Sequence, residues 1–427
     1  MPQYSRPIKV LHTSDWHLGR TLADVDRKED FRSFLAWLLG LIHERKPDVL
    51  VIAGDVFDTT MPASEAQRLY YEFLTKAASA PVGWVVVTAG NHDSQRFLRA
   101  PRELLATIRT FVAGSSAEDE AFVLRDEAGA PLLGIAAVPY LREGDVRIAS
   151  EGESDGERAA AWGRGVAEHY RAARTKLAEL LGDAEVPVIA TGHLFVTGSA
   201  TGAAPGNADG SVHVGTIRNV ASSVFGDSWD YVALGHIHRA QKVKAAIPVR
   251  YSGSPLALDI GGAEDPHQVV MVTIGTDGAV DEELIEVPQP RRLARVSGDI
   301  LTLKMKIEEI ASGSPGAIVE AVYEGEPVDA SALVQELNQC CGHAGVYLAA
   351  VRSRVSSRRE GDEPPVRSLD EITPDGVFKS VLDRENVEEE ERARLAPLFA
   401  EILETALAQE RERAAAGEEN RVKDGED

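Results

Sequence analysis

The chain is poor in cysteine and contains no long apolar run. Its 427 residues include only two cysteines, the adjacent Cys340 and Cys341, which excludes a disulfide framework and favours a reducing compartment. Neighbouring cysteines could bridge or bind a metal, but we interpret them as small apolar residues near the end of a helix. No apolar stretch approaches the ~20 residues of a membrane helix, and residues 8–11 are too short for a secretory core. We therefore predict a cytoplasmic protein without membrane contact.

Positive charge is also scarce. The 45 Lys and Arg residues face 68 Asp and Glu residues, which gives a net charge of −23 and argues against a simple nucleic-acid coat protein. A nuclease is not excluded, because divalent cations can offset clustered carboxylates and local basic patches can hold a phosphate backbone. Two basic clusters could do so, although a solvated mixed-charge surface is an equally good interpretation. They comprise Arg291, Arg292, Arg295, Lys304 and Lys306, and then Arg352, Arg354, Arg358 and Arg359.

Apolar runs alternate with amphipathic stretches over the first 290 residues or so. This alternation predicts an α/β protein with a mainly parallel sheet, whose chemistry lies beyond the carboxyl ends of the strands. A strand pair is predicted near 121–138, and segments at 249–253, 268–275 and 282–288 could form a second sheet, with both sheets sandwiched between helices. The other predicted strands cover 8–14, 48–53, 84–89, 186–191 and 230–234, and the predicted helices cover 27–45, 64–79 and 159–182.

The composition changes near residue 290. Residues 291–355 read as a small α+β unit, with helices at 301–311 and 329–341 and strands at 317–324 and 346–353. A charged segment with Pro364-Pro365 follows and resembles a linker. The Gly- and Ala-rich stretch at 198–213 is predicted to be a mobile loop. We divide the chain into a main domain (1–289), a small domain (290–355), a linker (356–373), amphipathic C-terminal helices (374–412) and a charged, disordered tail (413–427).

Five short motifs supply carboxylate, imidazole and amide groups, and four of them directly follow an apolar, β-branched run. Each motif alone is weak, but their order and placement together are typical of a two-metal phosphoesterase centre built on strand ends. The pattern therefore predicts metal-assisted hydrolysis of a phosphate ester. The motifs are Asp15-Trp16-His17, Gly54-Asp55-Val56-Phe57-Asp58, Gly90-Asn91-His92-Asp93, Gly192-His193 and Gly235-His236-Ile237-His238.

The residue types suggest how such a centre is built. Asp55 is the best candidate for a carboxylate that bridges two cations ~3.5–4 Å apart, because it lies between an apolar strand and a helix. Asp15 and His17 can point the same way on an extended segment, and together with Asp55 and one more imidazole they would make a first metal site. Asn91, Asp55 and two imidazoles would complete a second one. His236 and His238 repeat the spacing of two residues, so one of them could serve each metal.

The expected cations are Mn²⁺, with Mg²⁺ less well suited to this mixture of oxygen and nitrogen ligands. His92 could protonate the leaving oxygen or stabilise the charged phosphorane. Asp58 and Asp93 could orient the ligands. Six other histidines lack this context and are interpreted as structural, with His12 the least certain because it lies three residues before Asp15. They are His12, His43, His169, His213, His267 and His343.

At these motifs the chain resembles the calcineurin-like metallophosphoesterases. More narrowly, it resembles the SbcD family, the nuclease subunits of bacterial SbcCD complexes. The similarity rests on the strings at 11–19, 53–58, 89–94, 190–194, 231–241 and 251–255. It implies a four-layer α/β/β/α sandwich with a small capping domain at 291–355 that helps to hold DNA, and C-terminal helices near 375–384 and 396–411 that dock on an SMC-like SbcC-type ATPase. It also implies a homodimer within a heterotetramer.

Carried over to matching positions, the resemblance implies that Asp15, His17, Asp55 and His238 hold one Mn²⁺ ion. Asp55, Asn91, His193 and His236 would hold the other, with His92 catalytic. The implied activities are 3′-to-5′ degradation of double-stranded DNA ends and endonucleolytic cleavage of single strands and hairpins. Archaeal relatives carry a histidine in place of Asp58, so no role of that histidine is transferred. Because the chain has no Gly-x-x-x-x-Gly-Lys-Ser/Thr motif, any use of ATP must come from a partner.

Two rival interpretations remain at this point. A stand-alone phosphodiesterase or phosphatase acting on small esters could use the same metal centre, although it would not need the small domain or the C-terminal helices. A non-catalytic scaffold with a vestigial centre is the other rival, and it is disfavoured because every predicted ligand position carries a suitable residue.

Overall fold

The computed structural model describes residues 4–114, 116–147, 153–197 and 219–354, together with Arg392 and Phe399. The chain divides into two units, 1–355 and 356–427, and all the sheets and helices named here belong to the first unit. Several predicted features lie outside the described residues. They are the loop at 198–213, the linker at 356–373, the C-terminal helices at 374–412, the tail at 413–427, His213, Arg358 and Arg359.

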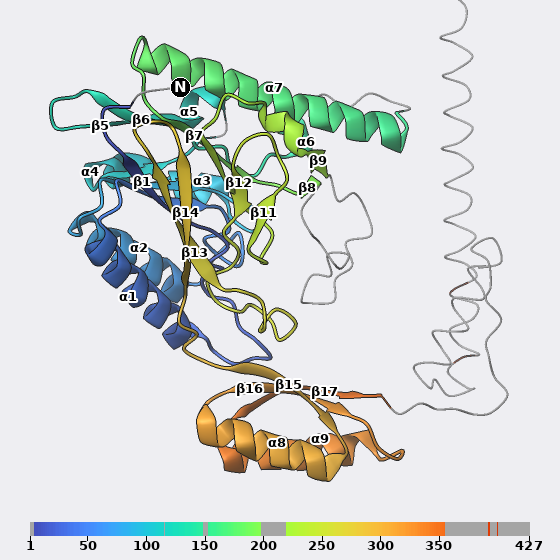
Figure 1. Ribbon diagram of the computed structural model, residues 1–427. Coiled ribbons are helices and arrows are strands. Elements are labelled where there is room, and N and C mark those ends of the chain that lie inside the picture. Colours follow the sequence, from blue (N-terminus) through green and yellow to red (C-terminus); the bar gives the residue numbers. More distant parts are fainter. Residues whose placement is uncertain are drawn as a thin grey trace, which may run out of the picture. The chain divides into compact units, whose positions relative to one another are not determined.

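Two six-stranded sheets dominate the described part of the chain (Figure 1). In the first sheet, of order β14-β13-β1-β2-β3-β4, the strands β1, β2, β3 and β4 run parallel, as the alternation of strands and helices predicted. The strands of this sheet are β1 (Ile8–Thr13), β2 (Val49–Ala53), β3 (Trp84–Thr88), β4 (Thr110–Val112), β13 (Gln268–Ile274) and β14 (Val280–Glu286), and the helices between them are α1 (Lys28–Arg45), α2 (Ser64–Ala78), α3 (Gln95–Arg99) and α4 (Arg102–Thr107).

The second sheet has the order β11-β12-β10-β7-β6-β5. Its four inner strands, β12, β10, β7 and β6, are parallel, and antiparallel strands close both edges. Its strands are β5 (Ala121–Arg125), β6 (Pro131–Ala136), β7 (Val188–His193), β10 (Tyr231–Gly235), β11 (Gln241–Val243) and β12 (Val249–Tyr251). Associated short elements are α5 (Ala117–Glu120), α6 (Glu143–Val146), β8 (Val196–Thr197), β9 (Val220–Ala221) and η1 (Ser222–Phe225), and the long helix is α7 (Asp155–Leu181).

One expectation about the sheets was wrong. We expected 249–253, 268–275 and 282–288 to share a second sheet, but only β12 does so. β13 instead pairs antiparallel with β1 and carries β14 with it. The run from Val269 to Val272 is buried on both faces, and the free side of β1 can receive such a strand. Sequence order favours neighbouring strands, and here tertiary packing overrides it.

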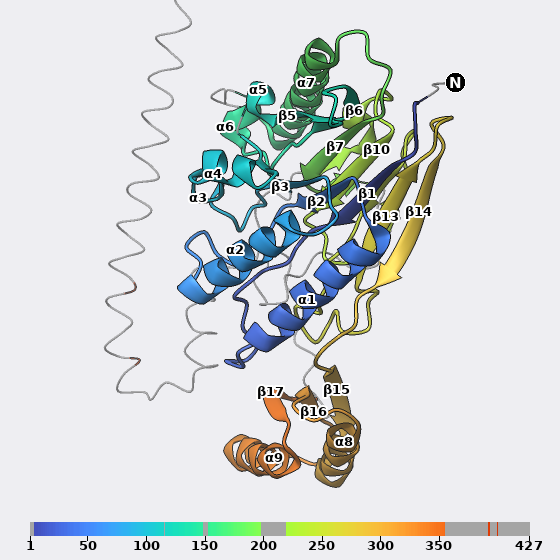
Figure 2. The same ribbon diagram turned by 90° about the vertical axis from the view of Figure 1, so that its left-hand side faces the viewer.

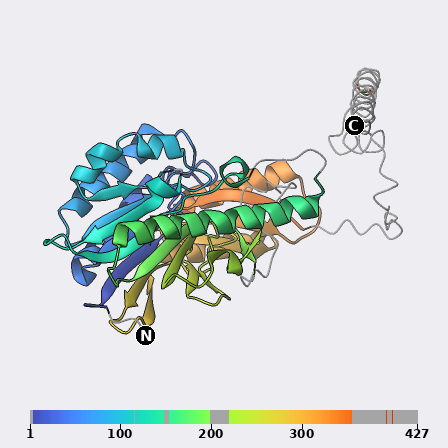
Figure 3. The same cartoon turned by 90° about the horizontal axis from the view of Figure 1, so that it is seen from above.

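Apolar side chains form a separate core against each sheet. One cluster joins α1 and α2 to the first sheet, a second joins α7 to the second sheet, and a third contains residues of both sheets, such as Val10, Val51, Ile135 and Ile189. Figure 2 shows α1 and α2 side by side on the first sheet, and Figure 3 shows α7 crossing over the second. The 18-residue helix α1 buries Phe31, whose face the sequence pattern predicted.

Residues 293–353 form a three-stranded parallel sheet of their own, of order β15-β16-β17, with two helices packed on one face. The elements are β15 (Leu293–Gly298), α8 (Ile300–Gly313), β16 (Ile318–Tyr323), α9 (Ala330–Ala344) and β17 (Tyr347–Ser353), and we call this part the cap. Cys341 is buried near the end of α9 and both cysteines are free, in keeping with the apolar interpretation. Among the described helices, none is long and apolar enough to span a membrane.

Candidate metal centre

The five predicted motifs meet where parallel strands of the two sheets end. Asp15, Asp55 and Asn91 follow β1, β2 and β3 of the first sheet, while His193 ends β7 and His236 follows β10 of the second. The carboxyl ends of neighbouring parallel strands lie at one edge of a sheet, and side chains on the loops beyond them converge. The two sheets face each other across a shared core, so the two sets of loops face each other as well.

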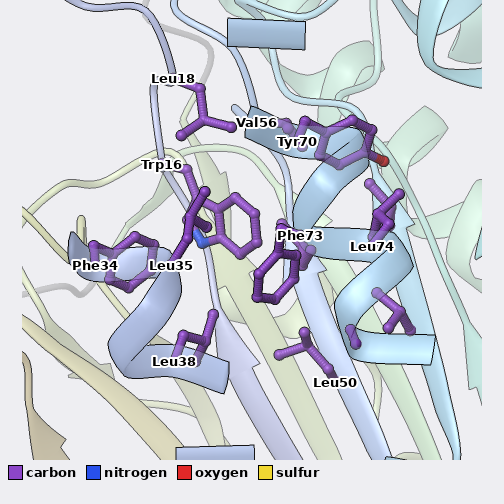
Figure 4. Packing of buried hydrophobic residues seen from close by; sticks show 14 of the residues in the cluster. Trp16, Leu18, Phe34, Leu35, Leu38, Leu50, Val56, Tyr70, Phe73 and Leu74 are labelled. Atoms are coloured by element: carbon purple, nitrogen blue, oxygen red, sulfur yellow. The ribbon is translucent and has the colours of Figure 1, made fainter. Parts of the chain in front are cut away.

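Trp16 anchors the first motif in the hydrophobic core. It is 1% exposed and its ring meets those of Phe34 and Phe73 edge to face, at centroid distances of 5.6 and 5.3 Å. Figure 4 shows the indole among the side chains of α1 and α2. Its Nε1–H donates to Thr13 Oγ1 at 3.0 Å. Burying Trp16 turns its two neighbours, Asp15 and His17, to the opposite side, where the centre lies.

The backbone around the ligands is held in an unusual conformation. Asp15, His17, Asp55 and His236 all have positive φ, from 48° to 94°, a region that non-glycine residues seldom adopt. Gly54 has a φ of +89°, and a Cβ there would lie 2.2 Å from His193 Nδ1. Four such residues at one site indicate that the ligand positions are fixed at a cost in local stability.

The first group of candidate ligands consists of Asp15, His17, Asp55 and His238, whose ligand atoms lie within 4.8 Å of one another. His17 Nε2 lies 3.2 Å from His238 Nε2 and 3.5 Å from Asp55 Oδ2. Asp15, His17 and Asp55 are at most 1% exposed. The structure thus brings together the residues that the resemblance assigned to one metal.

The second group consists of Asn91, His193 and His236, with Asp55 in common. Asn91 Oδ1 lies 3.1 Å from His193 Nε2 and 2.9 Å from His236 Nδ1. His193 Nε2 also lies 3.2 Å from Asp55 Oδ2. The two groups are therefore adjacent, and Asp55 lies between them, as expected for a bridging carboxylate.

The atoms in these contacts are better suited to binding a cation than to bonding with one another, because lone pairs face lone pairs. His193 Nδ1 lies 3.0 Å from the carbonyl oxygen of Ala53 and must donate its hydrogen there, so the neutral ring turns a lone pair toward Asn91. His17 Nδ1 lies 3.1 Å from Asp58 Oδ1, so its lone pair likewise faces His238 Nε2. Imidazoles fixed through one nitrogen and presenting the other are the usual arrangement of metal-binding histidines. The donor set suits a pair of divalent cations.

Charge in the centre is unbalanced without such cations. Burial lowers the pKa of His193, but the carboxylates of Asp55 and Asp15 outweigh burial and raise it to about 9. Burial raises the pKa of Asp55, but His193 and His17 lower it overall. His236 shows the opposite result, because its own burial lowers its pKa to about 3. Protons on His193 and His17 would balance the acids, and a bound cation would replace those protons.

Asp58 and Asp93 both accept hydrogen bonds from the residues or loops of the candidate ligands. Asp58 Oδ1 accepts from His17 Nδ1, which orients that ring. Asp93 accepts from the backbone N–H groups of Val56, Phe57 and Gly90 at 2.9–3.0 Å, and so ties the loop of Asp55 to the loop of Asn91. Burial, together with the negative charge of Asp55, raises the pKa of Asp93 to about 6.

His92 lies beside the first ligand group, where its backbone N–H donates to Asp55 Oδ1 at 2.9 Å and its ring forms a further group of possible metal ligands with His17 and Asp58. Its ring centroid is 4.8 Å from that of His17. Its Nδ1 lies 2.9 Å from the carbonyl oxygen of Asp58, to which it donates. This bond leaves Nε2 available on the other side of the ring, where it can exchange a proton with a bound substrate.

The relatives of this chain agree with the geometry. The profile of the calcineurin-like phosphoesterases matches residues 8–240. The SbcD protein of the nuclease SbcCD from Escherichia coli K12 is 30% identical over 95% of this chain and 100% of that protein. The SbcD proteins of Rhodobacter capsulatus and Bacillus subtilis are 34% and 30% identical, over 68% and 66% of this chain and 71% of their own lengths. This chain belongs to the SbcD family. It is therefore a phosphoester hydrolase of the calcineurin-like type.

Basic residues that we predicted to face DNA in this SbcD homologue mostly have acidic partners of their own. On the face of the cap sheet that carries no helices, Glu320 is 3% exposed and pairs with both Arg295 and Arg352. Lys306 donates to the carbonyl oxygen of Ser297 at 2.8 Å. The remaining pairs are Arg291 with Asp30, Lys304 with Glu336, and Arg354 with Glu324. The positive charge of both clusters is thus partly neutralised within the chain.

Among the other histidines within the described residues, His43 and His343 are exposed, and three have partners away from the centre. His12 is fully buried and its Nδ1 lies 3.1 Å from Tyr231 Oη. His169 contacts Glu120, and His267 lies against the carbonyl oxygens of Ser254 and Gly262.

Sequence reasoning missed several residues that support the ligands. Ser14 Oγ donates to Asp15 Oδ2 and lies 2.7 Å from Ser252 Oγ. Arg20 donates to Asp58 Oδ1 at 3.1 Å. The string at 251–255 was visible in the SbcD resemblance but had no assigned role, since the contact of Ser252 with Ser14 spans 238 positions.

Proposed function

We propose that this chain is the nuclease subunit of an SbcCD-type DNA repair complex and hydrolyses DNA phosphodiesters with two Mn²⁺ ions. One observation carries this proposal: the ligand groups of an SbcD homologue converge on Asp55 at the ends of two sheets. Bound cations would polarise the phosphate and supply hydroxide near neutral pH. Asp15, His17, Asp55 and His238 would hold one cation, and Asp55, Asn91, His193 and His236 the other. Mg²⁺ is a possible substitute.

The protein's own residues have distinct tasks in this proposal. Ala53 and Asp58 fix the tautomers of His193 and His17, which keeps their free nitrogens ready for a cation. His92 donates through Nδ1 to a backbone carbonyl, so its Nε2 carries a proton only in the charged ring. That proton would pass to the leaving oxygen, or would stabilise the charge on the phosphorus centre.

The substrate and partners follow from the family. The proposed activities are 3′-to-5′ exonuclease action on double-stranded ends and endonuclease action on single strands and hairpins. We propose that the main domain (1–289) has the four-layer α/β/β/α arrangement, which the three core clusters support, and that 290–355 acts as a DNA-holding cap. Helices at 374–412 would dock on an SbcC-type ATPase, within a cytoplasmic assembly containing a homodimer of this chain.

The proposal is tested with the purified chain on a labelled DNA hairpin in Mn²⁺, with and without the ATPase partner and ATP. We expect cleavage that disappears with a chelator and in the His92→Ala variant. Absence of hairpin cleavage in every condition, combined with turnover of bis-nitrophenyl phosphate, would instead favour a phosphodiesterase of small esters. Inactivity on both substrates despite Mn²⁺ binding would favour the scaffold interpretation.

A further inference from the structure

Residues 252–260 lie between the metal centre and the cap, and we call them the 252–260 segment. Its backbone and side chains are largely buried: Ser252, Ser254, Ala257 and Leu258 are at most 3% exposed. The segment follows β12 and includes most of the string at 251–255. We infer that it couples the position of the cap to the first ligand group, with Arg20 as a positioning residue for His17. This inference rests on the proposed metal centre.

At one end, the 252–260 segment supports three of the four residues of the first ligand group. Ser252 Oγ lies 2.7 Å from Ser14 Oγ, which donates to Asp15. Ser254 N–H donates to the carbonyl oxygen of His238 at 2.9 Å. Close packing reinforces this contact, since a Cβ added at Gly253 would lie 2.7 Å from the same carbonyl oxygen.

Arg20 connects the segment to the third residue, His17. Its Nε donates to the carbonyl oxygen of Leu258 at 3.2 Å, and its Nη1 donates to Asp58 Oδ1 at 3.1 Å. The same oxygen of Asp58 accepts from His17 Nδ1. A shift of Leu258 would therefore move Arg20, change the orientation of Asp58 and turn the imidazole that presents Nε2 to the cation. Such outer partners commonly change metal affinity by about ten- to a hundredfold.

At the other end, the segment is tied to the cap by a buried ionic network. Arg27, 1% exposed, donates to the carbonyl oxygen of Ala257 and to Asp30 Oδ2. Asp30 Oδ1 accepts from Arg291 Nε at 3.2 Å. The guanidinium of Arg291 lies 5.4 Å from the ring centroid of Tyr347 on β17. The two domains thus share one carboxylate, and its removal would leave Arg27 buried without an anionic partner.

Apolar contacts and an amide add to this connection. Ala257 forms a small cluster with Leu293 and Ile318 of the cap sheet. The side chain of Gln289, directly before the cap, accepts from Ala257 N–H at 3.1 Å and donates to the carbonyl oxygen of Pro255 at 3.0 Å. The 252–260 segment is therefore connected to the cap at several points, and we expect it to move when the cap moves.

The second ligand group is supported differently. His193 is fixed by the carbonyl oxygen of Ala53 on β2, and Asn91 contacts His193 and His236. A displacement of the cap should thus affect the two cations unequally. This inequality separates a specific coupling from a general loosening of the fold, which would weaken both sites.

The experiment measures Mn²⁺ affinity by calorimetry in two backgrounds of the full chain. Asn91→Ala removes a ligand of the second group, and His238→Ala removes one of the first. In the Asn91→Ala background we expect Arg20→Gln to weaken Mn²⁺ binding about tenfold and Arg291→Ala to weaken it about threefold. In the His238→Ala background both substitutions should have no effect. Arg45→Ala serves as the control. It removes an arginine–glutamate pair at the C-terminal end of α1, the helix that also carries Asp30.

Three results would overturn the inference. If neither substitution changed the Mn²⁺ affinity in the Asn91→Ala background, the 252–260 segment would not couple the cap to the first ligand group. Equal weakening in both backgrounds, or a matching loss in the Arg45→Ala control, would show general softening, and thermal unfolding of each variant monitors that. A wild-type chain that binds no Mn²⁺ would overturn the proposed metal centre itself, and the inference with it. Arg291→Lys should retain part of the wild-type affinity, since it keeps the charge beside Asp30.

Discussion

The metal centre and the cap differ in how their buried carboxylates are balanced. In the centre, Asp15 and Asp55 are buried among imidazoles whose lone pairs face one another or an amide oxygen, so the acids are balanced either by protons on the histidines or by an added cation. In the cap, Arg295 and Arg352 already share the buried carboxylate of Glu320. The first region can take up a ligand of opposite charge, whereas the second balances its buried carboxylate within the chain. A residue's type in the sequence does not reveal which of these two states it occupies.

The largest expected effect comes from removing the shared carboxylate of the centre. Asp55→Ala should lower hydrolysis by more than about a thousandfold, well beyond the ten- to hundredfold effect of an outer partner, because both ligand groups lose a member. Cleavage of a labelled hairpin and Mn²⁺ titration would measure the loss, with circular dichroism confirming the fold. Asp126→Ala, in an exposed turn, is the matched control. Full activity of Asp55→Ala would overturn the assignment of the centre.

The next effect separates chemistry from metal binding. His92→Ala should reduce the cleavage rate by about 10²–10⁴-fold, the usual range for a lost acid–base group, while Mn²⁺ affinity stays at the wild-type value. His43→Ala, on α1, should change neither quantity. If His92→Ala instead abolished Mn²⁺ binding, His92 would belong to the ligands, and its assigned role would be wrong.

A lower pH should weaken Mn²⁺ binding, because the histidines of the centre become protonated. The pKa of His193 is raised to about 9 in the metal-free chain, and a cation can bind only the neutral ring. Below that pKa the neutral fraction falls as pH falls, so Mn²⁺ affinity should decrease up to about tenfold per pH unit between 8 and 6. Binding should release protons, which calorimetry in buffers of different ionisation enthalpy detects. An affinity that is flat with pH would contradict the charge imbalance described for the centre.

The smallest effect concerns the cap. Glu320→Gln should free Arg295 and Arg352 from their shared carboxylate, raise DNA affinity a few-fold and steepen the salt dependence by roughly one released counterion. Fluorescence anisotropy at several salt concentrations measures both quantities. Glu324→Gln, beside Arg354 at the strand end, gives a comparison with an exposed acid. A salt slope equal to that of the wild-type chain would mean that these arginines do not meet the phosphate backbone.

Most residues of the candidate centre could be predicted from the sequence, because the patterns that identify them lie within a few neighbouring residues. Asp15, Asp55 and Asn91 each follow a strand that its own apolar run reveals, and parallel strands place such residues together. The placement of β13 and β14 was missed because no local pattern shows that β1 has a free side. Arg20 and Glu320 were missed for a related reason: their roles depend on partners that only the folded chain brings near, 238 residues away for Arg20 and Leu258.

The position of β1 in the first sheet also determines when this sheet can be completed during translation. β1 directly precedes Asp15 and His17, and it pairs with β13 in a register from Ile8 with Ile274 to His12 with Val270. Contacts between such distant segments form late, and a chain emerging from the ribosome must complete more than half its length before they are available. A polypeptide that ends before β13 therefore leaves this side of β1 unpaired, next to the segment that carries Asp15 and His17.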